Sequence, residues 1–497
     1  MRNISTIVLF LPLAGVAAIA LTPRDSARAA RVIALLASSA TFIASVLMLV
    51  RFDADQAGFQ MVVSAPWVPA AGATFRLGVD GISLWMVLLT TFLTPISLLA
   101  SWNLDRKVKA FHIVVLLLET GMLGVFLALD LILFYVFWEG MLIPMYFIIG
   151  IWGGSRRVYA AVKFFLYTLA GSLLMLAGIL ALYFLGGRTF DLEKLIAAGL
   201  PVGAERWLFA AFFASFAVKV PIWPFHTWLP DAHTEAPTAG SVLLAGVLLK
   251  MGAYGFLRLS LPLFPEASRS FAPWLAALGV IGILYGGAVS VVQRDLKRLV
   301  AYSSVSHLGF VTLGIASLTT TAASGSVLQM VNHGLSTGAL FLLVGMLYER
   351  SHSREISDFS GISKLLPAFS GVFLLVALSS LGLPGLNGFV GEFLILSGTF
   401  GVSRFLSIAG AGGIVLAAIY LLWAYERMFT GETRVPHQER RHSWRDLSVR
   451  EWFVVAPILA MIVFLGVFPR PFLERIEPSV EKLVNTVTTP SDQVARR

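Results

Sequence analysis

The chain has 497 residues, of which 57% are hydrophobic and only 13% are charged. Because a soluble globular domain carries about 25% charged residues, this composition excludes a soluble multidomain enzyme. The 37 Phe, 12 Trp and 11 Tyr exclude a disordered chain, and the lack of cysteine excludes disulfides, iron–sulfur clusters and c-type haem within it. The net charge of +9 is best explained by basic loops that orient the chain in a membrane.

Long apolar runs predict an all-α polytopic membrane protein. A helix needs about 20 apolar residues to cross the bilayer core. The sequence offers fourteen such runs, over residues 4–21, 32–50, 79–101, 111–129, 131–150, 164–185, 207–229, 240–260, 273–292, 299–318, 325–347, 368–397, 407–425 and 452–468. The first run also has features of a signal peptide, but its removal would leave thirteen spans and disturb the charge pattern of the loops.

Lys and Arg are distributed unevenly between alternate loops. The loops after spans 1, 3, 5, 9, 11 and 13 hold 21 basic residues, whereas the segments on the other side hold 8, the C-terminal tail apart. The positive-inside rule therefore predicts that the basic loops face the cytoplasm and that both termini are periplasmic. An even number of spans requires the same placement of the two ends. We expect a multi-pass protein of a bacterial inner membrane.

The polar stretches are too short to form a separate soluble domain. The longest are 51–78, 348–366, 426–451 and 469–497, and we expect no strands in the chain. We therefore expect a single integral membrane domain over 1–497. Its parts are predicted as the N-terminal spans 1–110, a first repeat 111–260, a second repeat 273–425, and the last span with the tail, 452–497.

Titratable side chains lie in the middle of several predicted spans. An unpaired charge at the bilayer centre costs at least ~2.5–3.5 kcal/mol, so such groups must face the bundle interior and find partners or water. One buried ion pair could simply fix the register of two helices, and a lone histidine could be an ordinary core residue. The number of these groups favours a proton or ion pathway instead. The seven candidates are Glu119, Glu139, Lys219, Lys250, His307, His333 and Glu392.

Two spans carry internal breaks. Pro221 and Pro224 interrupt span 7, and a Gly-Leu-Pro-Gly stretch around Pro384 interrupts span 12. Non-helical backbone at this depth persists only where it is buried in protein or lines a hydrated cavity. The two breaks are five spans apart, and five is odd. Spans 4–8 and 9–13 are therefore predicted to be inverted structural repeats, an arrangement typical of ion-moving transporters.

Five stretches carry a resemblance to a known family. They are 78–85, 137–146, 219–237, 295–307 and 383–392, and the likeness extends continuously over about 79–425. In these residues the chain resembles the antiporter-like membrane subunits of respiratory complex I, the proton-pumping NADH:quinone oxidoreductase. Within that family it is most similar to the chain M branch, because span 12 carries an acidic residue where related subunits often have lysine.

This resemblance implies a role in an enzyme complex. Quinone reduction in partner subunits would drive proton translocation through this chain, whose expected neighbours are other antiporter-like membrane-arm subunits and the lipid bilayer. NADH, FMN, iron–sulfur clusters and quinone are expected in the partner subunits, and no cofactor, metal or nucleic acid is expected on this chain. Position by position, the resemblance implies that Glu139 and Lys219 form a regulating pair, Lys250 a central relay and Glu392 the terminal group, with His307 and His333 as bridging groups.

Three other functions were weighed against this one. A subunit of a multi-subunit cation/proton antiporter would use the same charged axis, so the side chains alone do not distinguish the two. A di-haem electron carrier would need facing pairs among His226, His233, His307 and His333. A purely structural scaffold does not account for the charges in the middle of the spans.

Overall fold

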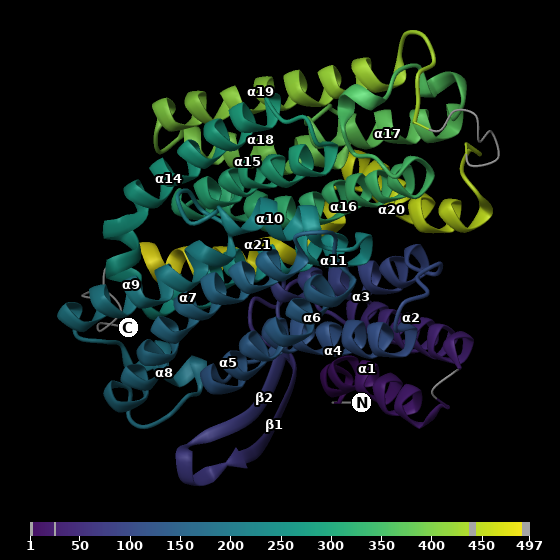
Figure 1. Cartoon of the computed structure of the whole chain (residues 1–497). Coiled ribbons are helices and arrows are strands. Elements are labelled where there is room, and N and C mark those ends of the chain that lie inside the picture. Colours follow the sequence, from purple (N-terminus) through teal and green to yellow (C-terminus); the bar gives the residue numbers. More distant parts are fainter. Residues whose placement is uncertain (1–2, 24–25, 437–443, 490–497) are drawn as a thin grey trace.

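The structure is a computed structural model that describes residues 3–23, 26–436 and 444–489. Long helices dominate it and run roughly alongside one another, as expected for a polytopic membrane protein (Figure 1). Parts of two predicted polar segments, 437–443 in the loop 426–451 and 490–497 in the tail, lie outside the described residues.

Twelve helical segments are long and apolar enough to cross a membrane, by length and composition. They are α1 (Ile4–Leu21), α2 (Ala27–Val50), α3 (Ser83–Ala100), α4 (Val108–Leu127), α5 with α6 (Leu131–Gly140 and Leu142–Trp152), α7 (Arg157–Leu185), α11 to α13 (Thr238–Leu263), α14 (Pro265–Val291), α15 (Leu296–Ala316), α16 (Thr320–Ser351), α19 (Arg404–Phe429) and α20 (Val449–Val467). The predicted class of a helical, multi-pass membrane protein is confirmed.

The two predicted spans that are not among these twelve are the two with internal breaks. The first consists of α9 (Val202–Lys219) and α10 (Trp228–Glu235), and the second of α17 (Pro367–Ser380) and α18 (Asn387–Phe400). In both, the helix stops at a proline-containing stretch, because proline removes a backbone donor; the second stretch also contains glycines, which permit unusual dihedral angles. The count of fourteen spans therefore depends on whether each broken pair crosses the bilayer, and it stays a prediction.

The helix that carries Lys250 is not a regular α-helix throughout, and the sequence did not indicate this. It consists of α11 (Thr238–Leu243), α12 (Leu249–Gly255) and α13 (Leu261–Leu263), joined by two wider π-helical turns, η2 (Leu244–Leu248) and η3 (Phe256–Ser260). Such turns often occur at functional sites, because they redirect carbonyl groups and side chains. Here one of them immediately precedes Lys250.

The prediction that the chain has no strands is wrong. Residues 51–78, expected to be a loop, include most of an antiparallel hairpin of β1 (Gln60–Val68) and β2 (Ala73–Val79), joined by a short turn of 3-10 helix, η1 (Pro69–Ala71). Gly72 follows this turn at φ 69°, a left-handed conformation that glycine adopts without strain. The hairpin is short and partly polar, so its pattern did not stand out beside the long apolar runs. Arg76 on β2 pairs with Asp191 and Glu193 at α8 (Leu192–Ala198).

The C-terminal tail contains a further helix, α21 (Arg470–Thr488), which is too polar for a membrane span. Its apolar side chains fall on one buried face: Phe472, Ile476, Val480, Leu483, Val484 and Val487. This face packs on α16, α14 and α13. Ser479 Oγ on the same helix accepts a hydrogen bond of 3.0 Å from the backbone N–H of Gly81, before α3. Three-residue 3-10 turns, η4 (Ile356–Asp358) and η5 (Ile362–Lys364), follow α16.

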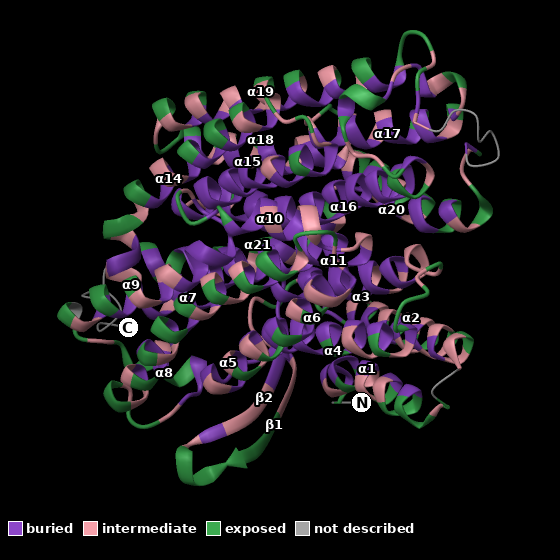
Figure 2. Cartoon of the chain, viewed as in Figure 1, coloured by how far each residue is buried: buried purple, intermediate pink, exposed green. Residues whose placement is uncertain are grey.

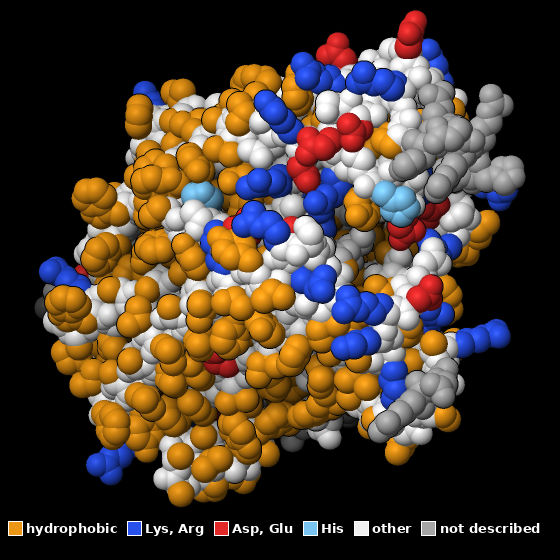
Figure 3. Space-filling model, viewed as in Figure 1, with side chains coloured by type: hydrophobic (Ala, Val, Ile, Leu, Met, Phe, Trp, Pro, Cys, Tyr) orange, Lys and Arg blue, Asp and Glu red, His pale blue; other side chains and the backbone are white. Residues whose placement is uncertain are grey.

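Burial divides the helices into an inner and an outer set. Three helices are buried almost throughout, namely the Lys250-bearing helix (α11 to α13), α15 and α16. In contrast, α1, α2, α7, α19 and α20 have one exposed side (Figure 2). The exposed sides carry many large apolar side chains, including Phe184, Trp274, Phe405 and Phe453. Figure 3 shows broad hydrophobic surface on the left and lower part of this face, with Lys and Arg gathered mainly toward the right. The outer helices thus present the surface expected against lipid.

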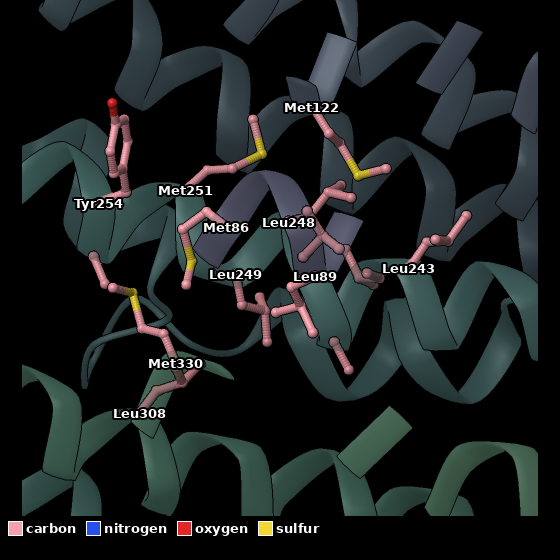
Figure 4. Packing of buried hydrophobic residues seen from close by; sticks show 14 of the residues in the cluster. Met86, Leu89, Met122, Leu243, Leu248, Leu249, Met251, Tyr254, Leu308 and Met330 are labelled. Carbon is pink, nitrogen blue, oxygen red and sulfur yellow. The ribbon is translucent and has the colours of Figure 1, made fainter. Parts of the chain in front are cut away.

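The inner set meets in a packed apolar core. Met86 and Leu89 from α3, Met122 from α4, and Leu248 and Met251 from the Lys250-bearing helix approach one another closely (Figure 4). A single core spans the N-terminal and central helices, so the polar groups described below are enclosed in apolar packing rather than in a wide aqueous pore.

We predict opposite labelling of two exposed positions. Because the natural chain contains no cysteine, a Glu432→Cys variant and a Glu477→Cys variant each carry one thiol in this chain. The loop asymmetry predicts that a membrane-impermeant maleimide modifies Glu477→Cys from the periplasmic side, and Glu432→Cys only in inverted vesicles. Modification of both from the same face, measured by the mass of this chain, would contradict the even number of spans.

Candidate functional site

Lys219 is the last residue of α9, directly before the first break, and its side chain is fully buried. The negative end of a helix dipole favours a cation at this position. Its ammonium lies 3.8 Å from Met141 Sδ, and 5.2 Å and 5.6 Å from the ring centroids of Trp138 and Phe164. A thioether and two aromatic faces are weak partners for a charge, so this ammonium is held only loosely.

Glu139 lies on α5, near Lys219 but not in ion-pair contact with it. Its side chain is half-buried, and one carboxylate oxygen, Oε1, is buried without a hydrogen-bond partner among the described residues. Ser172 on α7 is the polar side chain beside it. The structure therefore places Glu139 and Lys219 near each other without a direct contact. A small motion or a bridging water molecule would connect the carboxylate and the ammonium.

Glu119 on α4 is fully buried, and neither carboxylate oxygen has a hydrogen-bond partner within the part of the chain that the structure describes. Thr94 on α3 is its nearest polar neighbour. A carboxyl group in such surroundings is strongly disfavoured as an anion. The structure does not join Glu119 to the other predicted site residues by any hydrogen bond.

Lys250 and His333 are brought together in the centre of the bundle. Lys250 Nζ lies 2.6 Å from His333 Nδ1 and also donates to the carbonyl oxygen of Ala245 in the preceding π-helical turn. Glycines allow this close approach, because a Cβ at Gly334 would lie 3.0 Å from the carbonyl oxygen of Gly246. The helix of Lys250 also packs tightly on the end of α9, where a Cβ at Gly252 would lie 2.8 Å from the backbone nitrogen of Val220.

His307 and Glu392 form the next group along the bundle. His307 Nδ1 on α15 lies 2.9 Å from Glu392 Oε1 on α18, and the same oxygen accepts a 3.0 Å hydrogen bond from Gln329 Nε2 on α16. The other ring nitrogen of His307 lies 3.4 Å from the Tyr420 hydroxyl on α19. The ring centroids of His307 and His333 are 5.9 Å apart. Lys250, His333, His307 and Glu392 therefore form a continuous row of buried titratable side chains.

A small polar cavity lies beside this row and has room for about one water molecule. Its lining includes both histidines of the row together with Gln329, Asn332, Ser336 and Ser379. Ser336 Oγ and Ser379 Oγ are 2.7 Å apart, and Ser379 Oγ donates to Asn387 Oδ1 at 2.5 Å. Hydroxyl and amide groups of this kind can hold a water molecule that connects the histidines to the second break.

The second break positions Glu392. Gly382 and Gly385 adopt φ 82° and 92° between α17 and α18, so the chain turns sharply and α18 restarts at Asn387. Asn332 Nδ2 donates a 2.7 Å hydrogen bond to the Asn387 carbonyl oxygen, which fixes the start of α18 against α16. Glu392 lies in the second turn of this helix and faces α15 and α16.

The structure therefore joins four of the seven predicted residues in one row, sets Glu139 and Lys219 near each other at the first break, and leaves Glu119 apart. The sequence analysis missed the polar side chains that complete the site: Gln329, Asn332, Ser336, Asn387 and Tyr420. These are uncharged residues in apolar runs, and only a polar stripe at helical spacing on α16 (Gln329, Asn332, His333, Ser336) could have indicated them. His233 had been considered only as a haem ligand.

The described residues contain no cluster of three or more His, Asp or Glu side chains arranged to hold a metal ion. The row is a chain of groups that accept and release protons, each within reach of the next directly or through one water. Such an arrangement can support proton transfer along the row.

Comparison with known proteins agrees with this geometry. Residues 128–417 match the family model described as "NADH:quinone oxidoreductase/Mrp antiporter, TM". The chain belongs to this NADH:quinone oxidoreductase/Mrp antiporter family. Among curated members, it is 46% identical to NADH-quinone oxidoreductase subunit M of Rhodobacter capsulatus, with 97% of each chain covered. It is 45% identical to NADH-ubiquinone oxidoreductase chain 4 of Arabidopsis thaliana, again over 97% of each chain.

Solved structures of family members have the same fold. A chain of respiratory complex I from Thermus thermophilus with bound NADH superposes with a TM-score of 0.90 at 32% identity, covering 98% of this chain and 100% of that one. A chain of the Mrp complex from Dietzia sp. gives a TM-score of 0.84 at 19% identity, with 98% and 99% covered. At that identity the second match shows the fold alone.

A test of the second break uses two glycines. A Cβ at Gly388, in the first turn of α18, would collide with the carbonyl oxygen of Ser379, whereas a Cβ at Gly371 on α17 would meet open space. We expect Gly388→Ala to displace the start of α18 and destabilise the chain by about 1–3 kcal/mol, the usual cost of overpacking. Gly371→Ala should behave as wild type. Equal thermal stability of the two variants in the purified, detergent-solubilised protein would contradict this arrangement.

Proposed function

We propose that the chain is a proton-translocating, antiporter-like subunit in the membrane arm of an NADH:quinone oxidoreductase. The observation that carries this proposal is the buried row of Lys250, His333, His307 and Glu392, with contacts of 2.6 Å and 2.9 Å at its two ends. A static core has no need for four titratable groups in sequence, since each costs free energy to bury. A proton relay needs such a row.

The row has different ends, which suits directional transfer. Glu392 Oε1 is contacted by the imidazole of His307 and by the amide donor of Gln329. Among the described residues, the ammonium of Lys250 contacts the Ala245 carbonyl oxygen and the ring of His333. We propose that protons pass from Lys250 through His333, His307 and the adjacent water cavity to Glu392.

Glu139 and Lys219 are proposed to regulate this transfer. A nearby carboxylate favours the charged form of a lysine, and burial disfavours it. Because Glu139 is close to Lys219 without touching it, a small displacement at the first break would change how firmly the lysine holds its proton. At this break, Lys219 has Met141 Sδ and the ring of Trp138 as its neighbours. Glu119, which is buried and has no hydrogen-bond partner among the described residues, is proposed as an accessory site.

In this proposal, the chain belongs to an enzyme complex but carries no redox centre itself. NADH oxidation, FMN, the iron–sulfur clusters and quinone reduction belong to partner subunits, and other antiporter-like subunits flank this chain in the membrane arm. We also propose that each broken pair, α9 with α10 and α17 with α18, crosses the bilayer. This gives fourteen spans in one membrane domain, inverted repeats over spans 4–8 and 9–13, and periplasmic termini in a bacterial inner membrane.

A cation/proton antiporter subunit without redox partners remains the second candidate, since that fold carries the same type of axis. The composition of the complex purified through a tag on this chain distinguishes the two. Flavin and iron–sulfur absorption in the purified complex supports the oxidoreductase, and a colourless complex overturns it.

Lys250 is the position at which loss of the relay is most easily measured. Lys250→Ala should leave assembly close to wild type. The substitution removes a fully buried cation that has few partners, and it leaves no opposite charge buried without its partner. NADH-driven proton uptake in inverted vesicles should fall by about tenfold or more, since a relay group is lost. Lys364→Ala, at an exposed loop position, is the matched control. Wild-type pumping in Lys250→Ala would remove this residue from the pathway.

A second test asks whether Glu139 and Lys219 regulate or only stabilise. Breaking a true buried ion pair costs about 3–5 kcal/mol and should impair assembly, with rescue when both charges are removed. Because the two groups are not in contact, we expect Glu139→Gln to assemble and lose most proton uptake, and Glu139→Asp to keep part of it. The double variant Glu139→Gln/Lys219→Met should assemble and stay inactive. Recovery of pumping in the double variant would show that Glu139 and Lys219 have only a structural role.

A further inference from the structure

A vestibule with a volume of about 550 Å³ opens at the helix ends where the sequence predicts the cytoplasmic face. It lies among the ends of α3, α6, α10 and α16 and the start of α11. Asn103, Glu235, Thr238, Tyr348 and Arg354 line it, and Lys297 is part of its wall. The relay described above does not include any of these residues.

Lys297, in the first turn of α15, is nearly fully buried. Its ammonium donates a 2.5 Å hydrogen bond to the carbonyl oxygen of Ala236, the residue that ends α10. Arg354 holds the same helix end from the other side, with a 2.6 Å hydrogen bond to the Thr234 carbonyl oxygen and a 3.2 Å ion pair to Asp295. Two cations thus hold the negative end of the short helix α10.

His233 lies one turn back on α10, on the inner side of this contact. It is fully buried, and neither of its ring nitrogens has a hydrogen-bond partner among the residues that the structure describes. Its ring stacks on Phe341 with centroids 4.7 Å apart. Lys297 and Lys250 are charged side chains in its neighbourhood. An imidazole with two unused nitrogens is costly to bury, so its position near these two lysines calls for a functional explanation.

We propose that Lys297 is a positioning residue that closes the vestibule against His233, and that His233 leads from the vestibule to Lys250 by a path that bypasses Glu139 and Lys219. This proposal rests on the proposed function and adds a second point of access to the relay. With Lys297 bound to Ala236, its ammonium blocks the path and repels a hydrated proton. When that hydrogen bond breaks, water from the vestibule reaches the imidazole.

The proton balance of this step is simple. Water in the vestibule delivers a proton to one ring nitrogen of His233, and the other ring nitrogen releases its proton through a bridging water to Lys250, after that lysine has passed its own proton to His333. The histidine ends in the opposite tautomer, and a tautomer exchange through water restores it. No electron donor or acceptor is required.

The closure can be tested without measuring pumping. Ser241 is fully buried beside His233, and its hydroxyl donates a 3.1 Å hydrogen bond to the His233 carbonyl oxygen. Asn103 is exposed at the vestibule. Each is replaced by cysteine in the otherwise cysteine-free chain, within the assembled complex. Inverted vesicles are then treated with a membrane-impermeant cationic methanethiosulfonate, and the mass of this chain is followed with time.

We expect Asn103→Cys to react rapidly in every background, and Ser241→Cys to be protected while Lys297 is present. Lys297→Met should raise the modification rate of Ser241→Cys by about tenfold or more, since one charge-assisted hydrogen bond no longer closes the path. Lys364→Met is the control and should leave the protection unchanged. Lys297→Gln, which keeps a donor without the charge, serves if Lys297→Met does not assemble, and it should also increase the rate.

Two results would overturn the closure: unchanged protection of Ser241→Cys in both Lys297 variants, or rapid modification while Lys297 is intact. Failure of the proposed function has a separate signature, namely normal proton uptake in Lys250→Ala. If both proposals hold, Lys297→Met vesicles should also sustain a smaller NADH-driven proton gradient while NADH oxidation continues.

Discussion

The cost of keeping charge inside a bilayer determines the rest of this structure. Seven candidate titratable side chains lie in the middle of predicted spans, and each must avoid lipid, find partners, or stay neutral. The inner helices α15, α16 and the Lys250-bearing helix are buried on all sides, so their polar groups never face lipid. The outer helices carry the apolar exposed surface instead. The division into two sets follows from this one constraint.

The two broken helices place their charged residues in different surroundings. At the first break, the end of α9 leaves Lys219 with a thioether and aromatic rings as its neighbours. At the second, the restart of α18 delivers Glu392 to two good hydrogen-bond donors. One end of the axis therefore holds a charge weakly and the other holds it firmly. The two ends of the axis therefore differ in the partners that they offer to an ionised side chain.

Close helix packing converts these separate positions into one row. Gly246 and Gly334 let the Lys250-bearing helix and α16 approach until Lys250 and His333 touch, and Gly252 brings the same helix against the end of α9. The π-helical turn before Lys250 presents the Ala245 carbonyl to its ammonium. Outside the bundle, the hairpin and α21 brace the helix ends, through the pairs of Arg76 and the contact between Gly81 and Ser479.

The sequence by itself determined the membrane class, the positions of the apolar helices, both breaks and the identity of the charged residues. These properties depend on local composition: an apolar run of fixed length, a proline that removes a donor, or a charge where none is tolerated. The sequence did not reveal the hairpin or α21, because their stability comes from packing on distant segments rather than from a strong local pattern.

Tertiary structure alone decided which charged groups touch. Lys250 meets His333 across 83 residues and His307 meets Glu392 across 85, while Glu139 and Lys219 remain apart. It also decided that Gln329, Asn332 and Ser336 complete the site, and that His233 has no hydrogen-bond partner among the described residues. Helix packing sets such contacts through the close approach of glycine-lined faces, and no spacing along the chain specifies which faces will meet.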